Sequence, residues 1–354
     1  MSQPQGALLV GSVNYPDAQT TFRTAATVLA GYLKRIPDGE VGKRFHWIMF
    51  QPDVLGQAEG IERIGAEPIP MPAGLDARPL RLADGVDAAA IELPPLGYAE
   101  AAIDSYAEFV KLRDEGVIAA GTRFQVSLPT PLAVISSFFF GDDRAAVDAV
   151  YTAAILREVA QIAAAIPAAD LAIQWDVASE MGIIERAAGY GAPMEAWWPG
   201  DPFDGLVERL AALIDAIPDG VEAGLHLCYG DVAETHFIEP TDTAQLVRFA
   251  NAVTAAAHRE LTWVHLPVPI ERDDDAYFAP LADLQLGEGT ELYLGLVHRQ
   301  DGVDGTTRRI EAARPFAPEF GVATECGIGR APADATAGLL AIHADVAAPW
   351  SDNR

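Results

Sequence analysis

Short apolar runs alternate with longer amphipathic segments along most of the chain. Most apolar runs stop at polar or turn-forming residues, as expected for buried parallel strands that emerge into loops. The segments between them carry apolar residues on one face, as a helix packed against a sheet does. The pattern predicts strands at 7–10, about 36, 124–128, 171–176, 221–229, 261–268, 292–298 and 322–326. It predicts helices at 21–33, 103–116, 147–162, 206–217 and 246–253, near 306 and around 339–342.

Repeated strand–helix units imply right-handed crossovers and parallel pairing. About eight strands favour a closed barrel over an open doubly wound sheet. No glycine-rich phosphate-binding fingerprint follows a predicted strand. The fold class expected is therefore α/β, a (β/α)8 TIM barrel.

The alternation is interrupted once, after the second predicted strand. Segment 41–95 is rich in Pro and Gly and has weak periodicity, and it is too long for a simple barrel loop. We expect an insertion there that carries a small hairpin or a cap. Since the rest of the pattern is continuous, residues 1–354 are expected to form one barrel domain.

Composition limits the partners. Half of the residues are hydrophobic and 21% are charged, which is ordinary for a globular enzyme. The formal net charge of −27 argues against nucleic acid and against anionic membrane surfaces, because both require Lys and Arg. No apolar run reaches the roughly 18 residues that span a bilayer, and no signal peptide is recognisable at the N-terminus. A cytoplasmic protein is expected.

The chain contains two cysteines, and both follow strand-like runs. Side chains alternate along a strand, so His226 and Cys228 face the same side and could bind one ion. Cys326 would complete a thiolate-rich set suited to zinc. The alternatives are two small buried side chains or a Cys228–Cys326 disulfide, and a disulfide is the weaker reading because cytoplasmic thiols stay reduced.

Active sites of such barrels lie at the carboxyl ends of the strands. Polar residues gather at or just beyond these predicted ends, and each has a plain structural alternative. Asp176 is either a loop cap or a substrate ligand, Glu40 could be a solvated loop residue, and His298 an ordinary rim histidine. The candidates are Ser12, Glu40, Thr130, Asp176, His226, Cys228, His265, His298 and Cys326.

Two segments resemble a known family. His-Leu-Cys-Tyr at 226–229 and Glu-Cys-Gly-Ile-Gly-Arg at 325–330 are similar to the zinc-binding segments of the cobalamin-independent methionine synthases. In the C-terminal barrel of that family, a His-x-Cys pair and a later Asp-Cys-Gly segment bind zinc. Further segments match in the same order along nearly the whole chain: Val10-Gly11-Ser12, Asp38-Gly39-Glu40, Ser127 to Val134, Gln174-Trp175-Asp176 and His298. The resemblance is to short, single-barrel members, and the fold is related to that of uroporphyrinogen decarboxylase.

The resemblance implies a zinc site formed by His226, Cys228 and Cys326. It places His298 near the metal and implies catalytic roles for His298 and Asp176. The substrate-binding residues that it implies are Ser12, Glu40, Thr130 and Asp176, with both carboxylates contacting the amino group of a homocysteine-like substrate.

The implied activity is zinc-dependent methyl transfer to a thiol, as in methionine biosynthesis. The methyl donor would be methyltetrahydrofolate or methylcobalamin. The partners expected are a small-molecule substrate and, for the second donor, a corrinoid protein, and a homo-oligomer is left open.

The sequence departs from the family at two positions. The family has a glutamate zinc ligand at the end of strand six, where Pro267 stands here. His265 has the same facing and is the candidate fourth ligand; otherwise three protein ligands leave an open position, as in catalytic zinc sites. Ser136-Ser137-Phe138 stands in place of the tryptophan that stacks on folate.

These departures leave two alternatives to methyl transfer. A metal-dependent lyase or decarboxylase acting on a small carbonyl compound could use the same barrel. A non-catalytic metal- or ligand-binding protein is the third hypothesis.

Overall fold

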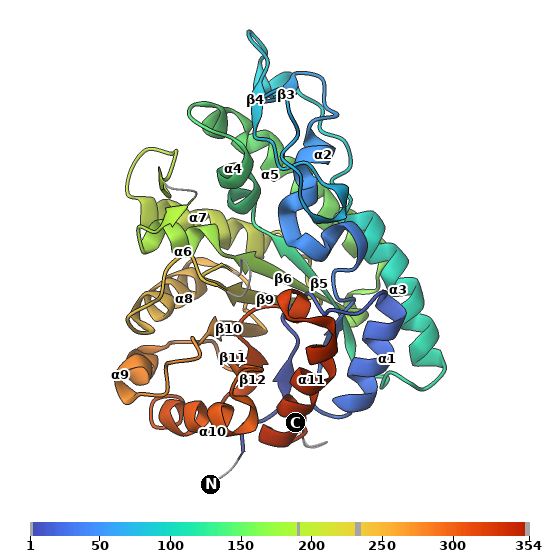
Figure 1. Ribbon diagram of the computed structural model, residues 1–354, viewed down its shortest axis with the longest axis vertical. Coiled ribbons are helices and arrows are strands. Elements are labelled where there is room, and N and C mark those ends of the chain that lie inside the picture. Colours follow the sequence, from blue (N-terminus) through green and yellow to red (C-terminus); the bar gives the residue numbers. More distant parts are fainter. Residues whose placement is uncertain (1–2, 190–191, 231–234, 351–354) are drawn as a thin grey trace.

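Eight parallel strands lie at the centre of the computed structural model, and helices surround them (Figure 1). The structure describes residues 3–189, 192–230 and 235–350. The strands follow the order β1-β12-β11-β10-β9-β6-β5-β2, and all neighbouring pairs are parallel. A parallel bridge between Ser12 and Gly39 joins the segments after β1 and β2, so the two sheet edges meet. The (β/α)8 barrel predicted from the sequence is confirmed.

The eight predicted strands and seven predicted helices lie close to observed elements, and the described residues also form four short α-helices that were not predicted. The barrel strands are β1 (Ala7–Leu8), β2 (Arg35–Pro37), β5 (Arg123–Pro129), β6 (Leu171–Val177), β9 (Glu222–Leu227), β10 (Trp263–Pro267), β11 (Glu291–Val297) and β12 (Gly321–Thr324). The helices are α1 (Ala18–Val28), α2 (Gln51–Leu55), α3 (Tyr98–Asp114), α4 (Pro131–Phe138), α5 (Asp143–Ala165), α6 (Ser179–Ile184), α7 (Pro202–Asp215), α8 (Ala244–Ala256), α9 (Asp275–Phe278), α10 (Gly302–Ala313) and α11 (Thr336–Val346). Two short antiparallel pairs join β3 (Ile61–Arg63) to β4 (Leu80–Leu82) and β7 (Ala188–Gly189) to β8 (Ala192–Pro193).

Helix α1 shows why its predicted boundaries were shifted. It begins before Thr21 because the Asp17 carboxylate accepts the backbone N–H of Thr20 and caps the first turn. It ends at Val28, ahead of a tight turn in which the Tyr32 N–H donates to the Leu29 carbonyl. Both signals are local hydrogen bonds that apolar periodicity does not report.

The inside of the barrel is closed at the amino ends of the strands. Trp263 and Tyr293 lie in an apolar cluster whose members come from strands on opposite sides of the barrel. Below them the buried Arg35 guanidinium lies 4.3 Å from the Trp263 ring and pairs with Glu222 at 3.0 Å and Glu291 at 2.9 Å. The apolar cluster and the charged layer fill the barrel at the amino ends of the strands. A ligand would therefore enter from the carboxyl ends.

The segment 41–95 contains the β3–β4 hairpin, which projects at one end of the molecule (Figure 1). The first part of the segment is a 3₁₀ helix, η1 (Gly42–Phe50), which brings Trp47 over the barrel mouth. A role for the hairpin as a cap remains a prediction.

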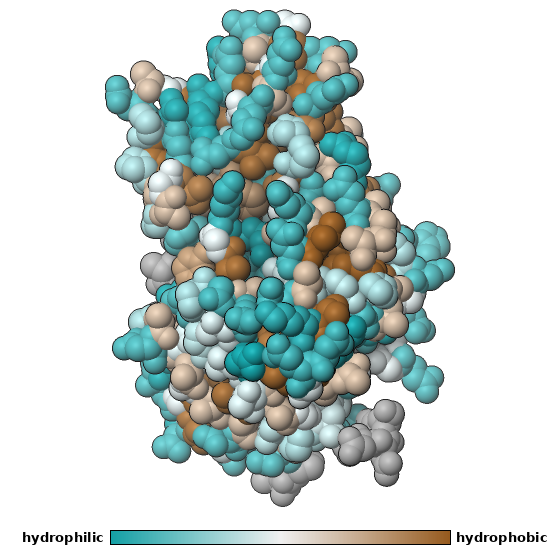
Figure 2. Space-filling view, turned by 90° about the vertical axis from the view of Figure 1, so that its right-hand side faces the viewer, coloured by the Kyte–Doolittle hydropathy of each residue, from teal (hydrophilic) through white to brown (hydrophobic). Residues whose placement is uncertain are grey.

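Hydrophilic and hydrophobic residues are interspersed on the face shown in Figure 2. Among the described residues, no helix combines the length and the apolar character needed to span a bilayer.

Candidate metal and substrate site

The predicted site residues lie at the carboxyl ends of the barrel strands. Ser12, Glu40 and Thr130 follow β1, β2 and β5. Asp176 is the last residue but one of β6. His226 and His265 belong to β9 and β10, whereas Cys228, His298 and Cys326 follow β9, β11 and β12. These positions at the carboxyl ends of the strands agree with those predicted from the sequence.

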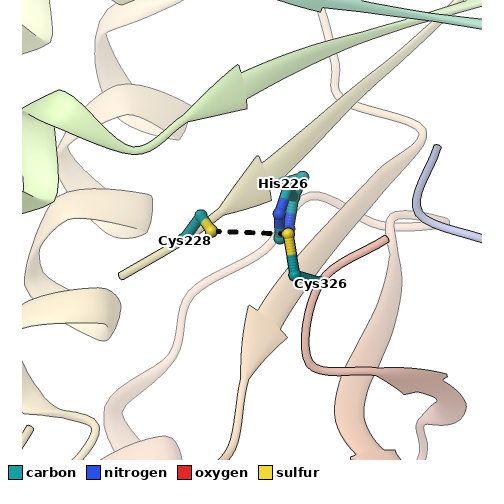
Figure 3. Close-up of side chains that lie close together, drawn as sticks. All are labelled: His226, Cys228 and Cys326. Carbon is teal, nitrogen blue, oxygen red and sulfur yellow. Dashed lines mark hydrogen bonds between the residues drawn. The ribbon is translucent and has the colours of Figure 1, made fainter. Parts of the chain in front are cut away.

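His226, Cys228 and Cys326 point toward one another across the barrel mouth (Figure 3). Their candidate ligand atoms all lie within 4.8 Å of one another. The two Sγ atoms are 3.7 Å apart and both cysteines are free thiols, so the structure does not contain the alternative disulfide.

This geometry fits zinc. Two thiolates on a tetrahedral zinc, each about 2.3 Å from the ion, are separated by about 3.8 Å, and the Sγ–Sγ distance here is 3.7 Å. The hydrogen bond with Cys326 and the nearby His226 hold the pKa of the Cys228 thiol well below its usual value, although burial opposes them. The site therefore favours the thiolate form that binds metal.

His265 lies behind His226 and does not belong to this group. Its Nδ1 atom is 2.8 Å from Nδ1 of His226, and its Nε2 atom is 3.0 Å from the carbonyl oxygen of Thr324. Burial, with His226 close by, holds the pKa of His265 well below its ordinary value. Both ring nitrogens are thus engaged within the protein.

A cavity of about 500 Å³ opens beside the thiols. Six of the nine predicted site residues line it, together with Trp47 and Arg330 from outside the predicted set. The six are Ser12, Glu40, Asp176, His226, Cys228 and Cys326.

Two buried carboxyl groups face this cavity. Burial, reinforced by the nearby Asp176, raises the pKa of Glu40 to about 8. Burial also raises the pKa of Asp176 to about 6, against the opposing effects of His226, Gln174 and the Trp47 side chain. Such a pair favours a cationic group between or beside its members, because a positive charge would offset the cost of ionising both.

The backbone holds Glu40 in an uncommon conformation. Glu40 and Trp47 are non-glycine residues with positive φ, at 53° and 55°. Asp38 fixes the turn: its carboxylate accepts the Glu40 N–H at 2.9 Å and pairs with Arg44 at 2.5 Å. Residues held in sparsely populated conformations often lie at functional sites, since the surrounding structure must maintain them.

A second cavity of about 620 Å³ shares Gly230, Cys326, Gly327 and Arg330 with the first. His298, the predicted catalytic histidine, lines this second cavity, and burial lowers its pKa to about 4.

Glu325 connects His298 to another histidine of the second cavity. Its carboxylate lies 2.9 Å from Nε2 of His236 and 4.0 Å from Nδ1 of His298. Burial lowers the pKa of His236, but the ion pairs with Glu325 and Glu239 outweigh it and raise the value to about 9. The two carboxylates therefore favour the protonated form of His236, while burial raises the pKa of Glu325 itself to about 7.

Thr130 is placed differently from the other predicted residues. It is buried at the start of α4 and is not among the residues that line either cavity. It contacts Glu180, whose pKa burial raises to about 7. A direct role of Thr130 in substrate binding remains a prediction.

Sequence reasoning missed Trp47, Arg330, His236 and Glu325. Glu325 and Arg330 belong to the same short segment as Cys326, so their proximity to the site could have been inferred. Trp47 and His236 come from loops, whose path over the barrel has no periodic signal.

No family model and no curated protein matches the chain. Solved structures do match. A protein of Listeria monocytogenes assigned as a vitamin B12-independent methionine synthase is 14% identical, with a TM-score of 0.57 over 99% of this chain and 100% of that one.

Two further structures are similar over almost their whole length. A B12-independent methionine synthase from Shewanella sp. W3-18-1, in complex with selenomethionine, is 13% identical with a TM-score of 0.57, over 97% of this chain and 96% of that one. A methyltransferase from Methanosarcina mazei is 13% identical with a TM-score of 0.54, over 97% and 94%. The chain has the fold of the B12-independent methionine synthases. In this methionine-synthase-like barrel, the thiols and the carboxylates occupy the end where barrel enzymes carry out their chemistry.

Proposed function

We propose that the protein is a zinc-dependent enzyme that transfers a methyl group to the sulfur of a small amino thiol, similar to homocysteine. The observation that carries the proposal is the arrangement of His226, Cys228 and Cys326 in the wall of a cavity that also contains Glu40 and Asp176. The three residues that would bind zinc and the two carboxyl groups that would bind a cation therefore line the same cavity.

His226, Cys228 and Cys326 would hold the zinc. Zinc bound there would lower the pKa of a substrate thiol and make its thiolate available at neutral pH. With three protein ligands, the set resembles catalytic zinc sites, which leave one position for substrate or water.

The two carboxylates would orient the acceptor. An ammonium group beside Glu40 and Asp176 would favour ionisation of both, because it neutralises charges that burial makes costly. Holding the ammonium group fixes the position of the thiol, which lowers the entropic cost of reaching the transition state. Ser12 and Arg330 line the same cavity and would contact the carboxylate end of the same molecule.

The second cavity would admit the methyl donor, since Cys326 and Arg330 belong to the walls of both cavities. In the reaction, a carbon–sulfur bond forms while the bond from the methyl carbon to a folate nitrogen or to cobalt breaks. A folate nitrogen must gain a proton as it leaves. His298 lies on this side, and His236, whose protonated form the Glu325 and Glu239 carboxylates favour, would be the acid.

The donor would be one of the two that the family resemblance implies. A corrinoid protein would present methylcobalamin from outside the barrel, whereas methyltetrahydrofolate would enter as a small molecule. A reducing compartment such as the cytoplasm would keep both thiols available for metal.

Activity assays distinguish the proposal from the lyase alternative. Zinc-loaded protein is incubated with homocysteine and either methyltetrahydrofolate or methylcobalamin, and methionine is measured by mass spectrometry. We expect methionine with at least one donor, and its loss in the Cys326→Ser variant. Absence of product with both donors, together with metal-dependent consumption of a small carbonyl compound, would replace methyl transfer by the lyase or decarboxylase activity.

A further inference from the structure

Two buried histidines on neighbouring strands form a continuous hydrogen-bonded chain with a backbone carbonyl. His226 and His265 are in register on β9 and β10, and their Nδ1 atoms are 2.8 Å apart. On the far side of its ring, His265 Nε2 lies 3.0 Å from the Thr324 carbonyl oxygen. The exposed fractions of the two histidines are 2% and 0%.

The carbonyl oxygen determines where the protons lie. It can only accept, so Nε2 of His265 must carry the N–H that donates to it. A neutral His265 then has its lone pair on Nδ1, which can only accept from Nδ1–H of His226. The lone pair of neutral His226 is therefore on Nε2.

The backbone is shaped to allow this chain. His265 reaches Thr324 on β12 across β11, which lies between β10 and β12 in the sheet. At Gly295 of β11 a Cβ would lie 2.7 Å from Cα of Glu325 and 3.1 Å from the Thr324 oxygen. The pairing of β11 with β12 also shifts register between Leu294 and Val297. The absence of a side chain at Gly295 thus lets the Thr324 carbonyl approach the barrel axis.

We propose that His265 is a positioning residue that selects the Nε2 metal-binding tautomer of His226 and holds its ring in place. This inference rests on the zinc site of the proposed function and assigns His265 a place behind a ligand. The Thr324 hydroxyl also donates to the Cys326 carbonyl at 2.6 Å, so the same chain connects His226 to the loop that carries Cys326. Through these hydrogen bonds, His265 connects β9, which carries His226 and leads to Cys228, with β12, which leads to Cys326.

The alternative, in which His265 is the fourth ligand, requires one of its ring nitrogens to leave its present partner. A metal on Nδ1 would displace His226, and a metal on Nε2 would displace the Thr324 carbonyl. Pro267, two residues further along β10 and on the same face, has no side-chain atom that could bind a metal. Strand β10 therefore contributes a histidine that positions His226, and it does not contribute a metal ligand of its own.

The tautomer can be measured directly on the metal-free protein. Long-range ¹H–¹⁵N correlation spectra of ¹⁵N-histidine-labelled protein distinguish a ring protonated on Nδ1 from one protonated on Nε2. We expect His226 to be protonated on Nδ1 and His265 on Nε2. The opposite tautomer of His226 in the wild-type protein would overturn the proposal, and this result does not depend on any variant or on methyl transfer.

Two variants separate positioning from packing. His265→Phe keeps the ring but removes both nitrogens, whereas His265→Gln keeps one acceptor and one donor. Loss of the partner of a metal-binding histidine typically weakens metal binding about 10- to 100-fold. We expect a loss of this size in His265→Phe and recovery to within a few-fold of wild type in His265→Gln, with zinc affinity measured by competition against a chromophoric chelator.

Cobalt substitution identifies a ligand role. If His265 binds the metal, His265→Gln will change the visible ligand-field spectrum of the Co(II) protein as strongly as His265→Phe does. We expect the His265→Gln spectrum to match that of the wild type. Should His265→Phe fail to fold, Gly295→Ala provides the same test, because it displaces the Thr324 carbonyl without altering either histidine and is expected to weaken zinc binding similarly. Unchanged zinc affinity in a folded Gly295→Ala or His265→Phe variant contradicts the proposal.

Discussion

The sulfur atoms of Cys228 and Cys326 lie 3.7 Å apart although 98 positions separate the two residues in the sequence. The two residues follow β9 and β12, which have β10 and β11 between them in the barrel. The loop after β12 turns inward over Ser12, and a Cβ at Gly327 would lie 2.2 Å from the Ser12 hydroxyl oxygen. The curvature of the barrel brings the ends of β9 and β12 together, and the close-packed loop after β12 holds Cys326 beside Cys228.

Replacing either thiol should remove the metal without unfolding the protein. Cys228→Ser or Cys326→Ser deletes a thiolate ligand, while the charged and apolar layers at the other end of the barrel stay intact. We expect about one zinc per chain in the wild type and a stoichiometric loss in each variant, measured by plasma mass spectrometry. Circular dichroism should remain unchanged. His258→Ala, at a histidine whose side chain is 91% exposed, is the matched control and should retain its zinc.

Metal removal should make the thiols sensitive to oxidation. At 3.7 Å, two thiols and one hydrogen peroxide can yield a disulfide and two waters after a small movement. The chelated protein should lose two hydrogens in intact-mass analysis and its reactivity toward a thiol reagent. Bound zinc should protect both cysteines. Equal rates of oxidation with and without zinc would contradict a shared metal site.

The acidity of Glu40 predicts a pH-dependent stability of the metal-free protein. Its pKa is about 8 in the folded state, against an ordinary value of 4.5. Between these values the folded state binds more protons than the unfolded state, so this group makes stability fall as pH rises from about 4.5 to about 8. The loss is complete above that range and absent below it.

Glu40→Gln should remove this dependence. The free energy of unfolding of the variant, relative to wild type, should increase between pH 5 and pH 8.5 by a few kcal/mol, since a tenfold change in proton affinity is worth about 1.4 kcal/mol. Urea denaturation at both pH values measures the difference. Glu59→Gln, at an exposed position, serves as the control and should show no such trend.

The charged layer at the amino ends of the strands should affect stability and leave the metal site unaffected. Arg35→Met leaves Glu222 and Glu291 without their buried partner, which typically costs about 3–5 kcal/mol. A lowered urea midpoint with unchanged zinc content is the expected result. If zinc is lost at a temperature where the variant is folded, the two ends of the barrel are coupled more strongly than the structure indicates.

Much of this architecture could be predicted from the sequence because it depends on periodicity. Strand β6 is buried along its whole length and is mostly apolar, and helix α5 buries one face, so the barrel and the carboxyl ends of its strands could be predicted from the sequence. His226 and Cys228 could be paired because strand alternation fixes their common face. Cys326 could be added only through its position at another strand end.

Other features depend on contacts that sequence spacing does not encode. His265 faces the same side as position 267, as expected, but its bonds to His226 and Thr324 were not foreseeable, because they require Gly295 to admit the β12 backbone. Thr130 follows its strand as predicted, yet it lies away from the cavity because α4 starts at once and buries it. Trp47 reaches the site through an irregular turn with positive φ.

X-ray absorption at the zinc edge can show whether zinc held by His226, Cys228 and Cys326 receives a substrate thiol. Spectra of the zinc-loaded protein are compared before and after addition of homocysteine, with methionine as the control ligand. We expect two protein sulfur neighbours at zinc, from the two cysteines of the chain, and one more after homocysteine but not after methionine. An unchanged sulfur count in the presence of saturating homocysteine would contradict this role of the zinc.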